Sequence, residues 1–436
     1  MIADRRSLIA DRSPVRREVR AVRGARAESP TLPGCRDSRL GLVDGVSFGF
    51  VAIQTLAQTP LLRPLARPHV VHLVQTLSGG GAESAVRLLC AGLPDEGVRT
   101  SVISVYGSGL DVAAARALGV PLFDLGRRGR GDYSYFPTLV GRLRALRPDL
   151  VHAHLHTGQY PGRVAALLAC VPSIVLTIHG REPGGPVRRA FDALLHPRTA
   201  RFVVFTEAQR QRFASEQNVP PERIVVIPNG ARSLPAPASR FDMRRALGIP
   251  QEAFALYAIG RFSEEKNHAA LLDGFAAAVA GGADRLHLVL AGAGPLEAEL
   301  KARAAALHIA ARVHFLGFRD DATALCSAMD LFVLSSFREA MPLALGEAML
   351  GGLAPLVTPW RDHDAFVRDG ENGYVARDFS AAGIADAIER ALTDPARPTL
   401  AARAREGAER MFDPGAMVAA HADLYRTLKF EARRAP

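Results

Sequence analysis

The feature that most constrains the fold is an alternation, beginning at His69, of short apolar segments with segments of helical period. Such alternation predicts a parallel sheet that is covered by helices on both faces. In the first part of the chain we predict strands at 69–76, 100–106, 150–154, 173–179, 201–205 and 224–227, with helices at 84–92, 110–118, 138–146 and 162–170.

A second series of the same kind follows residues 233–239, which read Ser-Leu-Pro-Ala-Pro-Ala-Ser and have the composition of a linker. There we predict strands at 255–260, 286–291, 313–316, 331–334 and 354–358, with helices at 269–280, 296–307, 322–328 and 344–350. A chain of 436 residues exceeds what one hydrophobic core usually supports. We therefore expect two doubly wound domains, at 68–235 and 236–412.

Residues 1–67 lack a sustained period and hold twelve Arg against six Asp or Glu. They supply +6 of the formal charge of +10, so the excess charge is not a nucleic-acid signal for the whole chain. We expect a disordered basic tail there, and a wrongly assigned start codon is the equal alternative. No signal peptide or long apolar run is present, and the four cysteines form no CxxC pair, which favours a cytoplasmic protein.

Ligands of open parallel sheets bind beyond the carboxyl ends of the strands, so residues just after each strand are the first candidates. Arg261 and Lys266 follow the strand at 255–260, and Lys266 is one of three lysines in an arginine-dominated chain. Two cations there could hold a diphosphate. Spacing alone leaves solvated surface positions as an equal alternative.

Two glycine-rich turns precede helices, whose N-termini favour anions. Gly292 and Gly294 follow the strand at 286–291, but Glu297 stands where a dinucleotide fingerprint has its third glycine. Gly80 and Gly81 belong to a run of three glycines after the first strand. Each turn is a candidate phosphate site, with a simple tight turn as the alternative.

Glu339 lies before a helix that is expected to begin near Pro342, and Glu347 lies inside it. Two carboxylates on one side of such a helix can accept hydrogen bonds from several hydroxyls of a sugar or ribose. Taken alone, the pair fits a capping acid and a solvated glutamate better.

His152, His154 and His156 alternate along one predicted strand edge, and His179 ends another strand. Alternating histidines can ligate a metal. No Cys, Asp or Glu nearby completes a ligand set, so we predict polar strand ends that face a cleft and no metal.

In their order along the chain, these motifs resemble retaining glycosyltransferases of family 4, or group 1, which have the GT-B fold. The likeness runs from His69 to about Phe430. It rests on Gly-Gly-Ala-Glu at 80–83, His-Ala-His at 152–154, Thr-Ile-His-Gly at 177–180, Ile-Pro-Asn-Gly at 227–230, Gly-Arg at 260–261 with Lys-Asn at 266–267, Ala-Gly-Ala-Gly-Pro at 291–295, Phe-Leu-Gly-Phe at 315–318, Glu339 with Glu347, and Asp-Gly-Glu-Asn-Gly-Tyr at 369–374.

The resemblance implies a nucleotide-sugar donor such as a UDP- or GDP-sugar, a glycan or lipid-linked acceptor, and no cofactor or metal. Arg261 and Lys266 would hold the donor diphosphate, Glu339 and His179 would lie at the transferred sugar, and Glu347 would bind the ribose. The other implied donor-binding residues are Gly80, Gly81, Gly292, Gly294, Phe318 and Leu343. Residues 413–436 would form a helix that crosses back to the first domain.

The sequence departs from the family pattern at 359–365, where Pro-Trp-Arg-Asp-His-Asp-Ala replaces a Gly-Gly-containing loop. This departure motivates an alternative, a catalytically silent GT-B protein that binds sugar or regulates. A nicotinamide-dependent oxidoreductase is a third possibility.

Residues 186–201 combine Phe191, Leu194 and Leu195 with several arginines. This composition suggests a hypothesis, that the segment makes peripheral contact with the inner membrane surface. The alternative, in which its apolar face packs into the first domain, is favoured.

Overall fold

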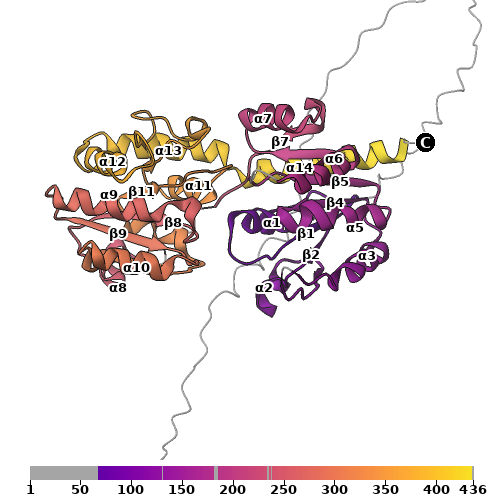
Figure 1. Cartoon of the computed structure of the whole chain (residues 1–436), viewed down its shortest axis with the longest axis horizontal. Coiled ribbons are helices and arrows are strands. Elements are labelled where there is room, and N and C mark those ends of the chain that lie inside the picture. Colours follow the sequence, from indigo (N-terminus) through magenta and orange to yellow (C-terminus); the bar gives the residue numbers. More distant parts are fainter. Residues whose placement is uncertain (1–66, 130, 181–184, 233–234, 237, 435–436) are drawn as a thin grey trace, which may run out of the picture. The chain divides into compact units, whose positions relative to one another are not determined.

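The computed structural model describes residues 67–436 except 130, 181–184, 233–234, 237 and 435–436. Residues 1–66 of the expected tail and part of the linker expected at 233–239 therefore lie outside the described residues. The described chain contains two parallel sheets with helices between their strands (Figure 1). This confirms the α/β class and the two doubly wound units that the sequence predicts.

The first sheet has seven parallel strands in the order β3-β2-β1-β4-β5-β6-β7. Its strands are β1 (His69–Val74), β2 (Arg99–Ser104), β3 (Leu122–Asp124), β4 (Leu150–His154), β5 (Ser173–Thr177), β6 (Arg201–Val204) and β7 (Ile224–Val226). The main helices of this part are α1 (Gly81–Gly92), α2 (Val112–Ala117), α3 (Tyr135–Leu146), α5 (Arg163–Leu168), α6 (Pro186–Leu195) and α7 (Glu207–Gln217).

The second sheet has six parallel strands in the order β10-β9-β8-β11-β12-β13. Its strands are β8 (Phe254–Ile259), β9 (Leu286–Ala291), β10 (Val313–Gly317), β11 (Leu331–Leu334), β12 (Pro355–Val357) and β13 (Tyr374–Val375). Its helices are α8 (Arg240–Leu247), α9 (His268–Ala280), α10 (Glu297–Ala306), α11 (Leu343–Leu350), α12 (Ala381–Thr393) and α13 (Arg397–Met411).

Strand β8 shows why its sequence reads as a continuous apolar run. Leu256 and Ala258 belong to one buried cluster, whereas Ala255 and Tyr257 belong to the cluster on the opposite face. Successive side chains of a strand point to opposite faces, so both faces of this sheet must be covered. The segment predicted as a helix at 322–328 is a 3₁₀ helix instead.

The last helix, α14 (Pro414–Arg434), packs against the first sheet although it follows the whole second sheet in sequence (Figure 1). Its Met417, Tyr425 and Leu428 share one buried cluster with Val70 of β1 and Leu150 of β4. Among the described helices, none combines the length and apolarity that crossing a bilayer requires.

Candidate functional site

The polar residues expected at the second sheet lie after its strands. Arg261 and Lys266 follow β8, Gly292 follows β9, Phe318 follows β10, and Glu339 follows β11. The side chain of Phe318 is 59% exposed, and Arg261 is also exposed. Parallel strands bring these residues to one edge of the sheet.

The centre of this edge is an ion pair between Lys266 and Glu339. The Lys266 Nζ donates to Glu339 Oε1 at 2.6 Å, and the Ser336 hydroxyl donates to the same oxygen at 2.6 Å. The Ser335 hydroxyl donates to the Lys266 carbonyl at 2.8 Å, which fixes the lysine loop to the end of β11. Two side chains expected to act on the donor are thus brought into contact.

The glycines after β9 allow adjacent turns to pack together. A Cβ on Gly292 would lie 1.8 Å from the carbonyl oxygen of Gly260, and one on Gly294 would lie 2.3 Å from that of Phe262. Gly292 N donates to Gly317 O at 2.8 Å, which ties the turns after β9 and β10. Close backbone approach therefore gives both glycines a structural role in positioning the Arg261 loop.

Helix α11 carries Leu343 at its first residue and Glu347 in its second turn. Burial raises the pKa of Glu347 to about 7, and the positive charge of Arg87 opposes the shift. A half-buried carboxyl group that titrates near neutral pH can both accept and donate hydrogen bonds. Such a group suits a ligand with hydroxyls, such as a ribose.

Helix α1 begins at Gly81, with Gly80 as its N-cap. The Glu83 carboxylate folds back so that a Cβ on Gly80 would lie 2.6 Å from its Oε2. Burial raises the pKa of Glu83, while a hydrogen bond from its own backbone N–H and the nearby Arg87 act in the opposite direction. Gly81 lies beside Leu343, whose Cδ1 would be 3.5 Å from a Cβ on Gly81.

Histidines on three neighbouring strands of the first sheet form one cluster. His72 lies on β1, His154 ends β4, and His179 follows β5. The His72 Nδ1 lies 3.1 Å from His154 Nε2, and His154 Nδ1 lies 3.2 Å from His179 Nε2. Burial lowers the pKa of both His72 and His179 to about 3, with His421 of α14 adding to the effect.

This arrangement corrects two expectations about the histidines. His152 and His154 are buried and not open strand ends. His421 and Tyr425 of α14 cover His152, whereas His154 packs against the rings of the other histidines of the cluster. The expected alternation also stops at His154, since Leu155 adopts a φ of 55° and the exposed His156 lies beyond the strand.

Sequence reasoning missed His72, His421 and Tyr425. His72 pairs in register with His152 of the neighbouring strand β4, and this adjacency becomes visible only once the order of the strands is known. Ring nitrogens of His72, His152 and His154 lie within 4.8 Å of one another, a spacing that a metal could use. The predicted absence of metal thus stays a prediction.

The loop at 359–365, which departs from the family pattern, contains a buried tryptophan. Trp360 is 1% exposed and belongs to a core cluster with Phe366 and Phe412. His363 Nδ1 lies 2.8 Å from the Trp360 carbonyl, and Asp362 adopts a φ of 69°. A bulky core side chain, and not a glycine pair, shapes this loop.

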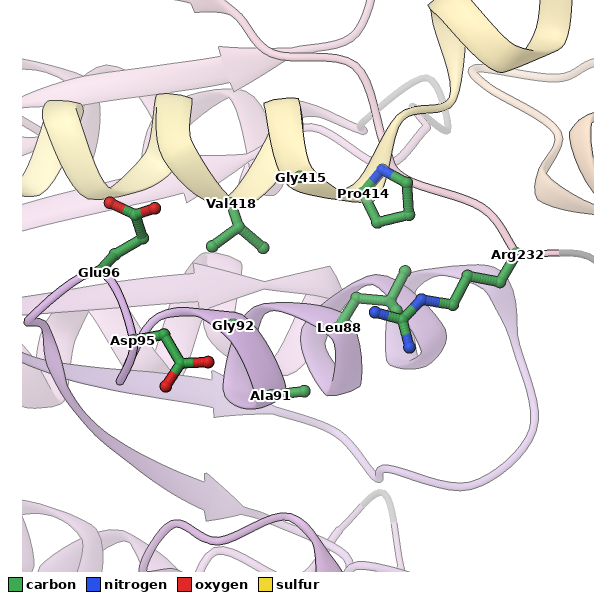
Figure 2. Close-up of a pocket in the computed structure, with 9 residues that line it drawn as sticks. All are labelled: Leu88, Ala91, Gly92, Asp95, Glu96, Arg232, Pro414, Gly415 and Val418. Carbon is green, nitrogen blue, oxygen red and sulfur yellow. The ribbon is translucent and has the colours of Figure 1, made fainter. Parts of the chain in front are cut away.

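A cavity of about 290 Å³ lies away from these residues, between the end of α1 and the start of α14 (Figure 2). Gly92 of α1 and Val418 of α14 line it from opposite helices, with Arg232 at one end and Asp95 and Glu96 at the other. A Cβ on Gly92 would lie 2.8 Å from Val418 Cγ2, so α1 and α14 are in close contact beside the cavity.

Family models match both parts of the chain that contain the two sheets. Residues 79–232 match the model for Glycosyltransferase Family 4, and residues 239–411 match that for Glycosyl transferases group 1. The chain belongs to glycosyltransferase family 4, group 1. The family expected from the motifs is confirmed.

Curated relatives of this family 4 chain include two bacterial proteins at 28% identity. One is the Escherichia coli UDP-Gal:alpha-D-GlcNAc-diphosphoundecaprenol alpha-1,3-galactosyltransferase, aligned over 56% of this chain and 66% of the relative. The other is the putative glycosyltransferase EpsF of Bacillus subtilis, aligned over 67% of this chain and 79% of the relative. The chain thus spans slightly less than two thirds of the first of these relatives.

Solved structures confirm the GT-B fold of the family 4 chain. Anabaena Alr3699/HepE in complex with UDP and glucose superposes with a TM-score of 0.71 at 21% identity, over 82% of this chain and 99% of that one. WaaG, a glycosyltransferase involved in lipopolysaccharide biosynthesis, gives a TM-score of 0.67 at 20% identity, over 82% and 99%. At these identities the likeness is one of fold.

Proposed function

We propose that the protein transfers a hexosyl group from a nucleotide-sugar donor to a glycan or lipid-linked acceptor, with retention of anomeric configuration. The observation that carries the proposal is the Lys266–Glu339 contact of 2.6 Å after the strands of the second sheet, in the same turn as Arg261. It joins a cation suited to a diphosphate with a carboxylate suited to sugar hydroxyls.

In this proposal the cations stabilise the leaving group. Negative charge accumulates on the nucleoside diphosphate as the glycosidic bond breaks, and Arg261 and Lys266 provide fixed positive charge there. Two side-chain cations can do the work that a divalent ion does elsewhere, so we propose metal-independent transfer. Glu339 positions hydroxyls of the sugar, and its contact with Lys266 couples sugar binding to diphosphate binding.

Retention follows if the acceptor attacks the face of the sugar that the diphosphate leaves. Glu339 Oε1 already accepts hydrogen bonds from Lys266 and Ser336, which makes it a poor nucleophile. The departing phosphate then takes the proton of the acceptor hydroxyl. His179 lies at the sugar.

The nucleotide binds to the second domain, which we assign to 236–412. The exposed ring of Phe318 is available to stack on the base, and Glu347 binds the ribose hydroxyls. Gly80, Gly81 and Leu343 contribute to the phosphate and sugar end. A UDP-sugar is the first donor to test, since HepE, which shares the fold, was solved with UDP and glucose.

The acceptor binds to the first domain, which we assign to 68–235 together with the last helix at 413–436. The Escherichia coli relative is named for a diphosphoundecaprenol-linked acceptor. A lipid-linked acceptor requires that the enzyme reach a membrane surface, and we propose that it does so from the cytoplasm by peripheral contact.

The exposed apolar side chains of helix α6 support membrane contact. Val187, Phe191 and Leu194 are 69%, 42% and 67% exposed, whereas Leu195 is buried. The favoured expectation, that the apolar face of this segment packs into the domain, is therefore right for Leu195 and wrong for Phe191 and Leu194. Residues spaced four and three apart share a helix face, and the adjacent arginines suit an anionic lipid surface.

The transfer proposal is tested by incubating the protein with UDP- and GDP-sugars and a panel of glycan and polyprenyl-diphosphate acceptors. We expect one donor to give product with its anomeric configuration retained, equally with and without EDTA. Lys266→Ala and Glu339→Ala should each lower kcat/KM about 100-fold. Lys301→Ala is the matched control, because Lys301 pairs with Glu297 at 2.7 Å on the exposed side of α10.

Membrane contact is tested by sedimentation with anionic vesicles at low salt. Val187→Ser with Leu194→Ser should reduce binding, and Val112→Ser, an equally exposed valine on α2, should not. Equal sedimentation of all variants would reject the role of α6.

A catalytically silent sugar-binding protein is the alternative, since the loop at 359–365 departs from the family pattern. It predicts donor binding by thermal shift without transfer or donor hydrolysis. A nicotinamide-dependent oxidoreductase predicts stabilisation by NAD, which we do not expect.

A further inference from the structure

Three imidazoles form a continuous hydrogen-bonded row from the interior of the first sheet to His179. The row is His72, His154 and His179, joined by contacts of 3.1 Å and 3.2 Å. The strand order explains it, since β1, β4 and β5 are neighbours and each supplies one histidine near its carboxyl end. His72 and His154 are 0% and 2% exposed.

The groups around this row are themselves hydrogen-bonded. His152 of β4 contacts the Tyr425 hydroxyl at 2.6 Å through Nδ1 and the Thr177 hydroxyl at 2.7 Å through Nε2. His421 of α14 donates from Nδ1 to the Met417 carbonyl at 2.8 Å. Burial lowers the pKa of all five histidines, His421 to about 4, so each ring is neutral at pH 7 and carries one N–H.

Neutral rings allow two arrangements of protons along the row. In one, His72 Nδ1–H donates to His154 Nε2, and His154 Nδ1–H donates to His179 Nε2, which leaves the proton of His179 on Nδ1. In the other, every donor and acceptor is reversed, and the proton of His179 lies on Nε2.

The far end of the row distinguishes the two arrangements. The Nε2 of His72 is buried and has no hydrogen-bond partner among the described residues. In the reversed arrangement this atom carries a proton, and a buried N–H without an acceptor is the rarer and costlier defect in folded proteins. In the first arrangement Nε2 is an unprotonated acceptor.

We infer that His72 and His154 are positioning residues that hold His179 in its Nδ1–H form, so that His179 donates a hydrogen bond from Nδ1 to an oxygen of the transferred sugar. The inference rests on the proposed function, because only that function says that the oxygen accepting this hydrogen bond belongs to the transferred sugar. Without this row, His179 could carry its proton on either nitrogen. In the Nε2–H form its Nδ1 would be unprotonated and could not donate a hydrogen bond to the sugar.

A metal bound by His72, His152 and His154 is the competing use of the cluster. Both ring nitrogens of His152 are already in hydrogen bonds, so a metal would have to displace the Thr177 or the Tyr425 hydroxyl. The same ion would place positive charge against buried His421 and the buried end of the row. The hydrogen bonds therefore favour neutral rings.

The direct test is the proton form of His179, measured in the whole protein by two-bond ¹H–¹⁵N correlation after ¹⁵N-histidine labelling. The His179 signals are assigned by their loss in His179→Asn. We expect the proton on Nδ1 in the wild type. A proton on Nε2, or a stoichiometric transition metal in the purified protein, would overturn the inference.

Kinetics of His154 variants provide the second test. Asparagine places its amide where Nδ1 of histidine lies, so His154→Asn can still donate to His179, whereas His154→Leu cannot. We expect kcat to fall about tenfold in His154→Leu with little change in donor KM, and to stay within about threefold in His154→Asn. Equal losses in both variants, or none in His154→Leu, would contradict a positioning role.

The matched control is His314→Asn, which removes a histidine paired with His287 at 3.0 Å in the second sheet. It should leave kcat unchanged. The two proposals fail separately: a wild type that transfers no sugar refutes the proposed function while the NMR result stands, and an active enzyme with His179 protonated on Nε2 refutes only the inference.

Discussion

Lys266 Nζ and Glu339 Oε1 meet at 2.6 Å although the two residues are 73 positions apart. Their side chains are 23% and 11% exposed, so either charge is costly when its partner is removed. The contact depends on two further hydroxyls, those of Ser335 and Ser336, which lie at the end of β11. A small polar network thus holds the two charges in place before any ligand arrives.

We predict that Lys266 and Glu339 are energetically coupled. Lys266→Ala and Glu339→Ala should each lower the free energy of unfolding. The loss in the double variant should be smaller than the sum of the two single losses by about 0.5–3 kcal/mol. Urea unfolding of the four proteins measures this coupling. The same cycle on Lys301 and Glu297 should give no more than about 0.5 kcal/mol. Additive effects at Lys266 and Glu339 would show that the pair is not a unit.

Glu347 should make stability decrease as pH rises. Its pKa is raised by burial from 4.5 to about 7, so between these values the folded protein holds a proton that the unfolded chain has released. The stabilising effect is complete below 4.5 and lost once pH has risen through 7. Glu347→Gln cannot ionise, and it should be more stable than the wild type at pH 8, by at most about 3 kcal/mol, with little difference at pH 5.

Unfolding by urea at both pH values tests the Glu347 prediction, and Glu406→Gln is the control because Glu406 is exposed on α13. If the two substitutions shift stability equally at pH 8, Glu347 is ionised without penalty in the fold.

Arg244 should be a major stabilising residue of the second domain. Its guanidinium is buried, pairs with Asp330 at 2.6 Å, and donates to the carbonyl oxygens of Ala328 and Ala253. Arg244→Met leaves these acceptors unsatisfied, and we expect a loss of about 3–5 kcal/mol in unfolding free energy. Arg245→Met changes the neighbouring arginine, which is 72% exposed, and should cost less than about 0.5 kcal/mol.

Gly292→Ala should weaken donor binding through the backbone. Its Cβ would overlap the Gly260 carbonyl oxygen, so the loop that carries Arg261 must move. We expect at least a tenfold weaker UDP affinity by calorimetry. Gly407→Ala, where a Cβ on α13 meets open space, should leave UDP binding unchanged and favour the helix. Unaltered affinity in Gly292→Ala would mean that the Arg261 loop does not bind the diphosphate.

The sequence predicted the sheets well, because strands buried on both faces read as apolar runs. Strand β8 was placed to within a residue. Two short edge strands, β3 and β13, which have three and two residues, were missed. The 3₁₀ helix at 322–328 was taken for an α-helix because seven small or apolar residues do not distinguish the two.

The candidate site was predicted in part for a similar reason. Residues directly after strands, such as Lys266 and Glu339, could be placed because parallel strands end at one edge. The histidine row could not be assembled from sequence, since it needs the order β1-β4-β5 and the cover provided by His421 and Tyr425 of α14. Contacts between residues some 270 positions apart, such as His152 with Tyr425, leave no local pattern.

The packing of α14 on the first sheet also determines the order in which the protein can be completed. Val70 is among the first core residues to leave the ribosome, and Tyr425 and Leu428, which share its cluster, are among the last. Domains generally fold as they emerge during synthesis, starting from the N-terminus. Here the first sheet cannot complete its core when it emerges, because the apolar face that α14 covers stays exposed until α14 has been translated.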